Sequence, residues 1–161
     1  MDYYEGVVVN YLRADRALFL NAECCIQINK GENPDTSGPH WYCDAVACDF
    51  RAKSIFLCEI SYSSRLASLT KRLREWHEHW NGVRGALIQD SHLPTDWPVR
   101  PWLFVPLDSV KLVVSRLNEI PELNYTPRIT TLEAVQPWRY RSWNRTNEEA
   151  KPDCIPVAMR D

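Results

Sequence analysis

The sequence has neither an excess of positive charge nor a long apolar run. Nineteen lysines and arginines against 21 acidic residues give a net charge of −2 and a pI near 6.1. A nearly neutral chain gives no global sign of nucleic-acid binding, so any such binding has to come from a local patch. No segment approaches the ~20 consecutive apolar residues that cross a bilayer, so we expect no membrane partner.

Features typical of a secreted or zinc-stabilised scaffold are also missing, although six cysteines are present. No N-terminal signal peptide precedes them, and most lie in apolar, strand-like segments. Cys43 and Cys48 lack the CxxC spacing of a structural zinc site, and His40 adds only a weak third ligand. We therefore expect reduced core thiols in a cytoplasmic protein.

No internal repeat, low-complexity tract or linker divides the chain. At 161 residues, 45% of them hydrophobic, it is large enough to bury a core without disulfide or metal support. We expect one domain over residues 1–136, followed by an irregular aromatic and basic arm over residues 137–161.

Hydrophobic periodicity predicts an α/β fold with a mixed central sheet flanked by helices. The predicted helices cover residues 2–19, 64–80 and 109–120, with Asp2, Ser63 or Ser64, and Asp108 as their caps. The predicted strands cover residues 22–29, 42–49, 54–62, 84–89, 100–105 and 128–135. The strand over 54–62 has an apolar run that suggests burial on both faces.

Two apolar strands each carry one acid, Asp44 in YCDAVACD and Glu59 in SIFLCEIS. An ionised carboxylate inside a dry strand costs several kcal/mol unless it is paired or binds a cation. Two carboxylates on neighbouring strands suit a hard cation such as Mg²⁺. The alternative is that nearby arginines or backbone groups satisfy both acids. Asp49, at a strand end, is interpreted as a turn residue.

The element order helix, strand, strand, strand, helix, strand, with an acid in the second and third strands, resembles the PD-(D/E)XK nuclease superfamily and its restriction-endonuclease-like fold. The resemblance covers roughly residues 2–90. It implies that Asp44 and Glu59 hold Mg²⁺ or Mn²⁺, that a lysine positions the attacking water, and that the substrate is DNA. The sequence departs from the motif, because Ser61 stands where that lysine belongs.

The resemblance points to further site residues. Some members of the superfamily carry the lysine on the following helix, where this chain has Lys71, with Arg65 and Arg72 as cationic alternatives. Members often carry an acid on the first helix, which implies Glu5 as a third metal ligand. Two simpler interpretations remain open: Lys71 as a solvated helix charge, and Glu5 as an acid that stabilises the start of its helix.

The C-terminal arm holds the best local nucleic-acid signal, because its aromatic and basic residues alternate. Aromatic rings can stack on bases while arginines contact phosphates. The alternative is an arm whose aromatics pack on the domain. The candidate residues are Trp138, Arg139, Arg141, Trp143 and Arg145.

Three functions follow from these patterns. The first is a metal-dependent nuclease that hydrolyses DNA phosphodiester bonds. The second is a nuclease fold that has lost catalysis and binds nucleic acid or protein, which the loss of the motif lysine at Ser61 favours. The third is an α/β interaction module with purely structural acids. A homodimer or a protein partner is compatible with each.

Overall fold

The computed structural model describes residues 2–27 and 40–140. The helices in these ranges are α1 (Tyr3–Arg13), α2 (Ala67–Glu78), α3 (Trp80–Ser91) and α4 (Val110–Asn118), with short 3-10 turns η1 (Leu107–Ser109) and η2 (Pro137–Arg139). The strands are β1 (Leu18–Gln27), β2 (His40–Asp49), β3 (Ser54–Ile60), β4 (Val99–Val105) and β5 (Arg128–Thr131). None of these helices is long and apolar enough to span a membrane.

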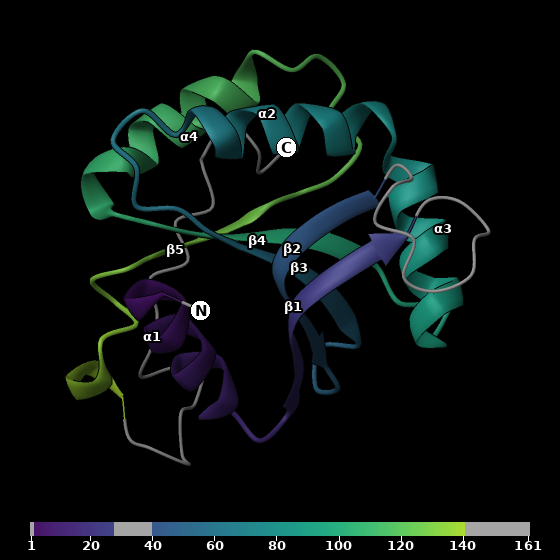
Figure 1. Cartoon of the computed structure of the whole chain (residues 1–161), viewed down its shortest axis with the longest axis horizontal. Helices are drawn as coiled ribbons and strands as arrows, with labels where there is room; N and C mark the ends of the chain where they lie inside the picture. The colour runs from purple at the N-terminus through teal and green to yellow at the C-terminus, as the bar shows by residue number, and fades with distance from the viewer. Residues whose placement is uncertain (1, 28–39, 141–161) are drawn as a thin grey trace.

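The strands form one mixed sheet in the order β1-β2-β3-β4-β5. β2 is antiparallel to β1 and β3, whereas β4 is parallel to β3 and to β5. The two parallel steps are made by helical crossovers, α2 with α3 and then α4, as parallel pairing requires. In Figure 1 the sheet lies between α1 on one side and α2 with α4 on the other. The predicted mixed α/β class is confirmed.

Two apolar clusters cover the opposite faces of the sheet. The cluster on the α1 face joins Val8 to Phe56 of β3, and the cluster on the other face joins Leu73 of α2 to Ile55 and Leu57. Because side chains of a strand alternate between faces, β3 contributes to both clusters. Residues 54–59 are all buried, so the predicted burial of this strand on both faces is confirmed.

The N-terminal helix starts as predicted but ends early. Glu5 donates its backbone N–H to Oδ1 of Asp2, and the N–H of Asp2 donates to Oε2 of Glu5, both at 2.8 Å. This reciprocal capping box confirms Asp2 as the helix cap. The helix ends at Arg13 and β1 begins at Leu18, so the helix predicted over 2–19 is too long and the strand predicted from residue 22 starts too late.

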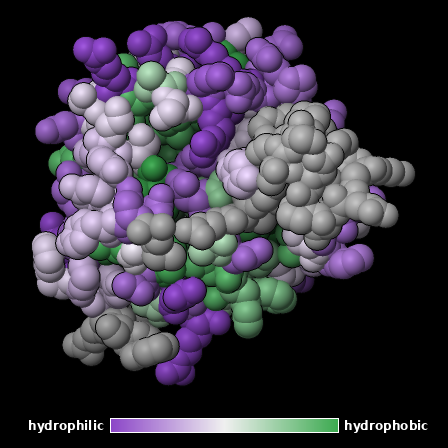
Figure 2. Space-filling view, viewed as in Figure 1, coloured by the Kyte–Doolittle hydropathy of each residue, from purple (hydrophilic) through white to green (hydrophobic). Residues whose placement is uncertain are grey.

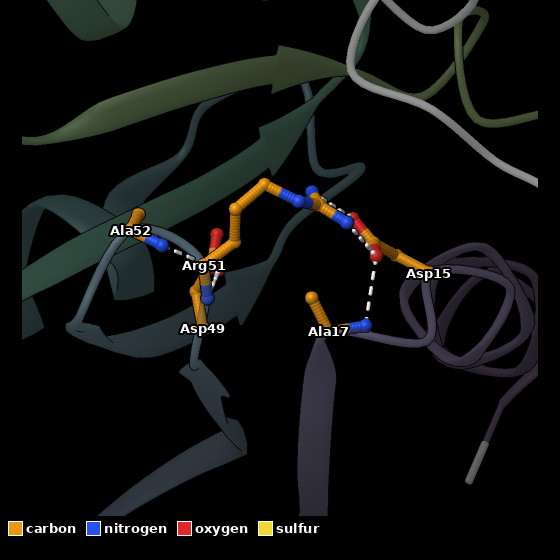
Figure 3. Close-up of polar contacts among 5 residues, drawn as sticks. All are labelled: Asp15, Ala17, Asp49, Arg51 and Ala52. Atoms are coloured by element: carbon orange, nitrogen blue, oxygen red, sulfur yellow. Dashed lines mark hydrogen bonds and ion pairs between the residues drawn. The ribbon is translucent and has the colours of Figure 1, made fainter.

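A buried carboxylate accounts for the early end of α1. Asp15 is 2% exposed, and its Oδ1 accepts the N–H of Ala17 at 2.9 Å. The guanidinium of Arg51 donates to both oxygens of Asp15 at 2.9 and 3.1 Å (Figure 3). In the same β2–β3 turn, Oδ1 of Asp49 accepts the N–H groups of Arg51 and Ala52, as expected for a turn residue. The hydrogen bonds of Asp15 thus end the helix and link the residues that follow it to the β2–β3 turn.

The strand predicted over residues 84–89 is wrong, because these residues lie in α3. The helix predicted over 64–80 breaks at His79, and a second helix starts at Trp80. Trp80, Val83 and Leu87 recur three and four residues apart and are all buried. The helical period of these core contacts outweighs the short apolar run that suggested a strand.

Other predicted boundaries need smaller corrections. Leu66, in the left-handed region with φ of 50°, takes the cap position of α2 in place of Ser63 or Ser64. Asp108 lies inside η1 and does not cap α4. β5 ends at Thr131, four residues before the predicted end.

The thiols agree with the sequence wherever the structure describes them. Cys43, Cys48 and Cys58 are buried and are not disulfide-bonded, so reduced core thiols are confirmed at these three positions. The side chains of Cys24 and Cys25 and all of Cys154 lie outside the described part of the structure.

Candidate functional site

Asp44 and Glu59 lie next to each other at one end of the sheet. Ala45 pairs with Cys58 at the end of the β2–β3 ladder, and one further antiparallel step sets Asp44 opposite Glu59. Oδ2 of Asp44 accepts the backbone N–H of Ile60 at 2.6 Å. A side-chain carboxylate therefore takes the place of a backbone carbonyl where the ladder stops.

The regular alternation of β2 changes at Asp44. Ala45 packs in the cluster under α1, whereas Cys43 and Val46 both pack in the cluster under α2. Asp44 is partly exposed at this irregular point. Its carboxylate is directed toward β3, where it accepts the N–H of Ile60.

Glu59 points to the α2 side of the sheet and is almost completely buried. Its relative exposure is 4%, and Nη1 of Arg72 on α2 donates to Oε2 at 2.5 Å. The other oxygen, Oε1, is buried and has no hydrogen-bond partner in the part of the chain that the structure describes. An unpaired buried carboxylate oxygen is costly, so this atom is an acceptor site without a resident donor.

The electrostatics of the pair are set by burial. Burial and, after it, the charge of Asp44 raise the pKa of Glu59 to about 8, although the hydrogen bond and charge of Arg72 oppose the shift. Burial likewise raises the pKa of Asp44, against the Ile60 N–H and the charge of Arg72. Neighbouring carboxyl groups with raised pKa values are typical of functional sites.

Of the cationic candidates on α2, Arg72 reaches the carboxylates and Lys71 does not. Leu69, Leu73 and Trp76 form the buried stripe of the helix, and Arg72 lies three residues after Leu69 and four before Trp76. Lys71 projects outward with a side-chain exposure of 78%, and its ammonium lies 3.7 Å from Glu75. The predicted solvated helix charge is thus what the structure shows for Lys71.

Ser61 and Glu5 border the pair without joining it in a ligand cluster. Ser61 lies one residue past the end of β3, where its N–H donates to the carbonyl of Phe104 at 3.0 Å. Glu5 is engaged in the capping box with Asp2, yet its charge still contributes to the raised pKa of Asp44. The helix-start role considered for Glu5 is therefore present, and its carboxylate is near enough to Asp44 to affect it.

An aromatic pair that the sequence did not predict lies beside the carboxylates. Tyr62, 52% exposed, stacks on Tyr4 of α1 with ring centroids 4.5 Å apart, and its hydroxyl bonds to Asp2. The sequence signal was only the position of Tyr62 directly after the third strand. The stack holds the chain leaving β3 against the start of α1.

Two carboxylates can hold a divalent cation only with help from other ligands. Within the described ranges, no three His, Cys, Asp or Glu side chains are grouped as a metal cluster. Mg²⁺ commonly binds one or two carboxylates and completes its shell with water and substrate phosphate oxygens. Asp44 and the unpartnered Oε1 of Glu59 fit that mode, whereas a cage made of protein ligands alone does not.

The C-terminal arm is described only at its start. Trp138 and Arg139 lie in η2 and are exposed, Trp138 at 77%. Arg141, Trp143 and Arg145 lie outside the described residues. The proposed nucleic-acid role of this arm stays a prediction.

No protein-family model matches the chain, and no significant match was found among curated proteins or solved structures. Its function therefore has to be inferred from the geometry and chemistry of the site.

Proposed function

We propose that this protein is a metal-dependent nuclease-like enzyme that hydrolyses phosphodiester bonds in DNA. The observation that carries the proposal is the buried Oε1 of Glu59, which lacks a partner in the described residues and belongs to a carboxylate beside Asp44. A divalent cation bound by both carboxylates would offset their mutual repulsion and give this oxygen a ligand to bind.

The arrangement of the chain supports a restriction-endonuclease-like core. Helix α1 precedes β1, β2 and β3, which are followed by helices and β4. The two acids occupy β2 and β3, as the resemblance to the PD-(D/E)XK superfamily implies. Glu59 also lies at the carboxyl end of β3, a parallel strand from which a crossover helix leaves, and Asp44 lies beside it on β2. The carboxyl ends of parallel strands are a common position for binding sites in α/β sheets.

Each residue of the site has a distinct role in this proposal. Asp44 and Glu59 bind Mg²⁺ or Mn²⁺, which when bound polarises the scissile phosphate and lowers the pKa of a water molecule. The backbone N–H of Ile60 orients the carboxylate of Asp44, and Arg72 orients that of Glu59.

Arg72 also supplies the positive charge that the motif loses at Ser61. It stands 2.5 Å from Glu59 and is partly buried. A guanidinium held in this way can stabilise the negative charge that develops on a phosphate during hydrolysis. We therefore assign to Arg72 the cationic role for which the sequence offered Lys71.

The proposal is tested by DNA cleavage in Mn²⁺ or Mg²⁺, with wild type compared to Asp44→Asn and Glu59→Gln. Asp108→Asn is the matched control, because Asp108 is an exposed acid outside the site. Wild type and control should cleave, chelator should stop them, and both site variants should be inactive. Cleavage that survives Glu59→Gln would contradict the proposal.

A second candidate is a nuclease fold without catalysis that binds nucleic acid. Arg72 already neutralises one oxygen of Glu59, and Ser61 replaces the motif lysine, which together favour this alternative. It predicts DNA binding that is independent of chelator and strongly dependent on salt.

A further inference from the structure

An open groove runs between α2 and α4 on the outer side of the molecule. Its volume is about 780 Å³. The side chains that line it are Ser64, Arg65, Ala67, Thr70, Lys71, Arg74, Glu75, Glu78, Leu112 and Arg116. Figure 1 places α2 and α4 next to each other along the top of the molecule, and Figure 2 shows mainly hydrophilic side chains there. We refer to this surface as the α2–α4 groove.

The α2–α4 groove is positively charged in a molecule that is negatively charged as a whole. Its lining holds four cations, Arg65, Lys71, Arg74 and Arg116, and two acids. The chain has a net charge of −2. A local excess of positive charge in a groove attracts polyanions even when the whole protein is acidic.

The acids around the groove leave part of this charge uncompensated. Arg74 and Arg116 share one partner, Glu119, at 3.0 and 3.2 Å. Lys71 has only a long contact with Glu75, and within the described ranges no acid lies in ion-pair distance of Arg65. Exposed pairs of this kind are weak, so these cations remain able to bind an incoming anion.

We propose that the α2–α4 groove binds the sugar-phosphate backbone of a nucleic acid. The arginines and lysine neutralise phosphates, and the hydroxyls of Ser64 and Thr70 can donate hydrogen bonds to phosphate oxygens. The choice of nucleic acid over an acidic protein rests on the function proposed above. The charge and shape of the groove stand independently of that function.

Helix α2 connects the groove to the carboxylate site. Its inner face carries Arg72, which contacts Glu59, and its outer face carries Lys71 and Arg74. The groove starts at Ser64, five residues after Glu59, in the segment that leads from β3 to α2. A strand bound along the groove would therefore pass close to the end of β3.

The test is the binding of a fluorescently labelled DNA duplex of about 20 base pairs, followed by anisotropy in EDTA at about 50 to about 200 mM salt. The groove variant is Arg65→Gln/Lys71→Gln, which changes two exposed side chains of the groove. The control is Arg13→Gln/Arg16→Gln, two exposed cations outside the groove, one at the last residue of α1 and one in the connection to β1. We expect the groove variant to bind the duplex at least about 10-fold more weakly than wild type. The slope of the logarithm of its binding constant against the logarithm of the salt concentration should be smaller in magnitude by about 1 to 2, and the control should match wild type in both respects.

Three outcomes would overturn the proposal: no binding by wild type in EDTA, equal binding by the groove variant, or displacement of the duplex by polyglutamate as effectively as by unlabelled DNA. The last would indicate an acidic protein partner. If neither wild type nor any variant cleaves DNA in Mn²⁺, but DNA binding still depends on the groove residues, the nuclease proposal is rejected and the groove proposal stands. Cleavage by wild type with unchanged binding by the groove variant would reject the groove alone.

Discussion

Arg72 of α2 donates a hydrogen bond to Glu59 of β3 at 2.5 Å, which links the crossover helix directly to the acidic end of the sheet. This contact satisfies one oxygen of a carboxyl group that is 4% exposed. It does not keep the group in its ordinary ionisation range, because burial and Asp44 together raise the pKa of Glu59 to about 8. Arg72 is therefore the partner of Glu59, and its charge also acts on Asp44, whose pKa it lowers.

Replacement of Arg72 should separate metal binding from catalysis. In Arg72→Met a positive charge near the two acids is lost, so Mn²⁺ affinity should be unchanged or higher, while cleavage should fall about 10²- to 10³-fold. The free energy of unfolding should decrease by about 1–3 kcal/mol, because Glu59 loses its hydrogen bond. Calorimetry, cleavage rates and urea unfolding measure the three effects. Full cleavage by Arg72→Met would refute the role of Arg72, and Arg72→Lys tests whether charge alone suffices.

Glu59 should make the folded state less stable as the pH rises. Its pKa is about 8 when folded and near the ordinary value of 4.5 when unfolded, so the folded state binds more protons between these limits. Stability from this group is then complete below about pH 4.5 and is lost as the pH approaches 8. The upper limit of the effect is about 1.4 kcal/mol per pH unit.

The neutral variant Glu59→Gln should remove this dependence. Its stability should equal that of wild type near pH 5 and exceed it increasingly toward pH 8, as measured by urea unfolding across that range. Glu78→Gln changes an exposed acid of α2, and its difference in stability from wild type should be the same at every pH. If the difference in the free energy of unfolding between Glu59→Gln and wild type is also the same at every pH, Glu59 is ionised over the whole range measured.

Asp44 has a structural role that can be separated from metal binding. In Asp44→Asn the side-chain amide oxygen can still accept the N–H of Ile60, so stability should remain within about 1 kcal/mol of wild type. Asp44→Ala leaves that N–H without its acceptor and should cost about 1–3 kcal/mol. Both variants should lose Mn²⁺ binding. Thermal unfolding distinguishes them, and equal stability of the two would show that the Ile60 contact contributes little.

The Asp15–Arg51 contact should stabilise the fold without affecting the site. Asp15 is buried and accepts two hydrogen bonds from Arg51, so Asp15→Asn should lower the free energy of unfolding by about 2 kcal/mol. Glu119→Gln, which breaks exposed pairs with Arg74 and Arg116, should cost less than about 1 kcal/mol. Mn²⁺ binding by Asp15→Asn should match wild type, since Arg51 lies in the turn at the far end of β2 and β3. A larger loss in Glu119→Gln than in Asp15→Asn would contradict this ranking.

Much of the fold follows from periodicity, and the errors occur where two patterns compete. Leu66, Leu69, Leu73 and Trp76 are buried as their spacing predicts, and the two acid-bearing strands are neighbours. Asn81-Gly82 has the composition of a helix end, yet the break occurs at His79 and the helix resumes. Local composition cannot show that the apolar face of α3 has a sheet to pack on.

The site was predictable in its acids and not in its cation. Asp44 and Glu59 stand out because charge is rare in apolar strands. The choice between Lys71 and Arg72 depends on helix rotation, since adjacent residues of a helix point about 100° apart. The position of Arg72 beside the leucine stripe was visible in the sequence, and it favours Arg72 once the helix is known to pack on β3.

The most direct test of the account is a calorimetric titration of wild type, Asp44→Asn and Glu59→Gln with Mn²⁺ in the presence of a DNA duplex. The duplex is included because two carboxylates need phosphate or water oxygens to complete a metal shell. We predict saturable Mn²⁺ binding by wild type that is lost in both variants, while Asp108→Asn binds like wild type. Equal Mn²⁺ binding by wild type and Glu59→Gln would contradict the assignment of a metal site to Asp44 and Glu59.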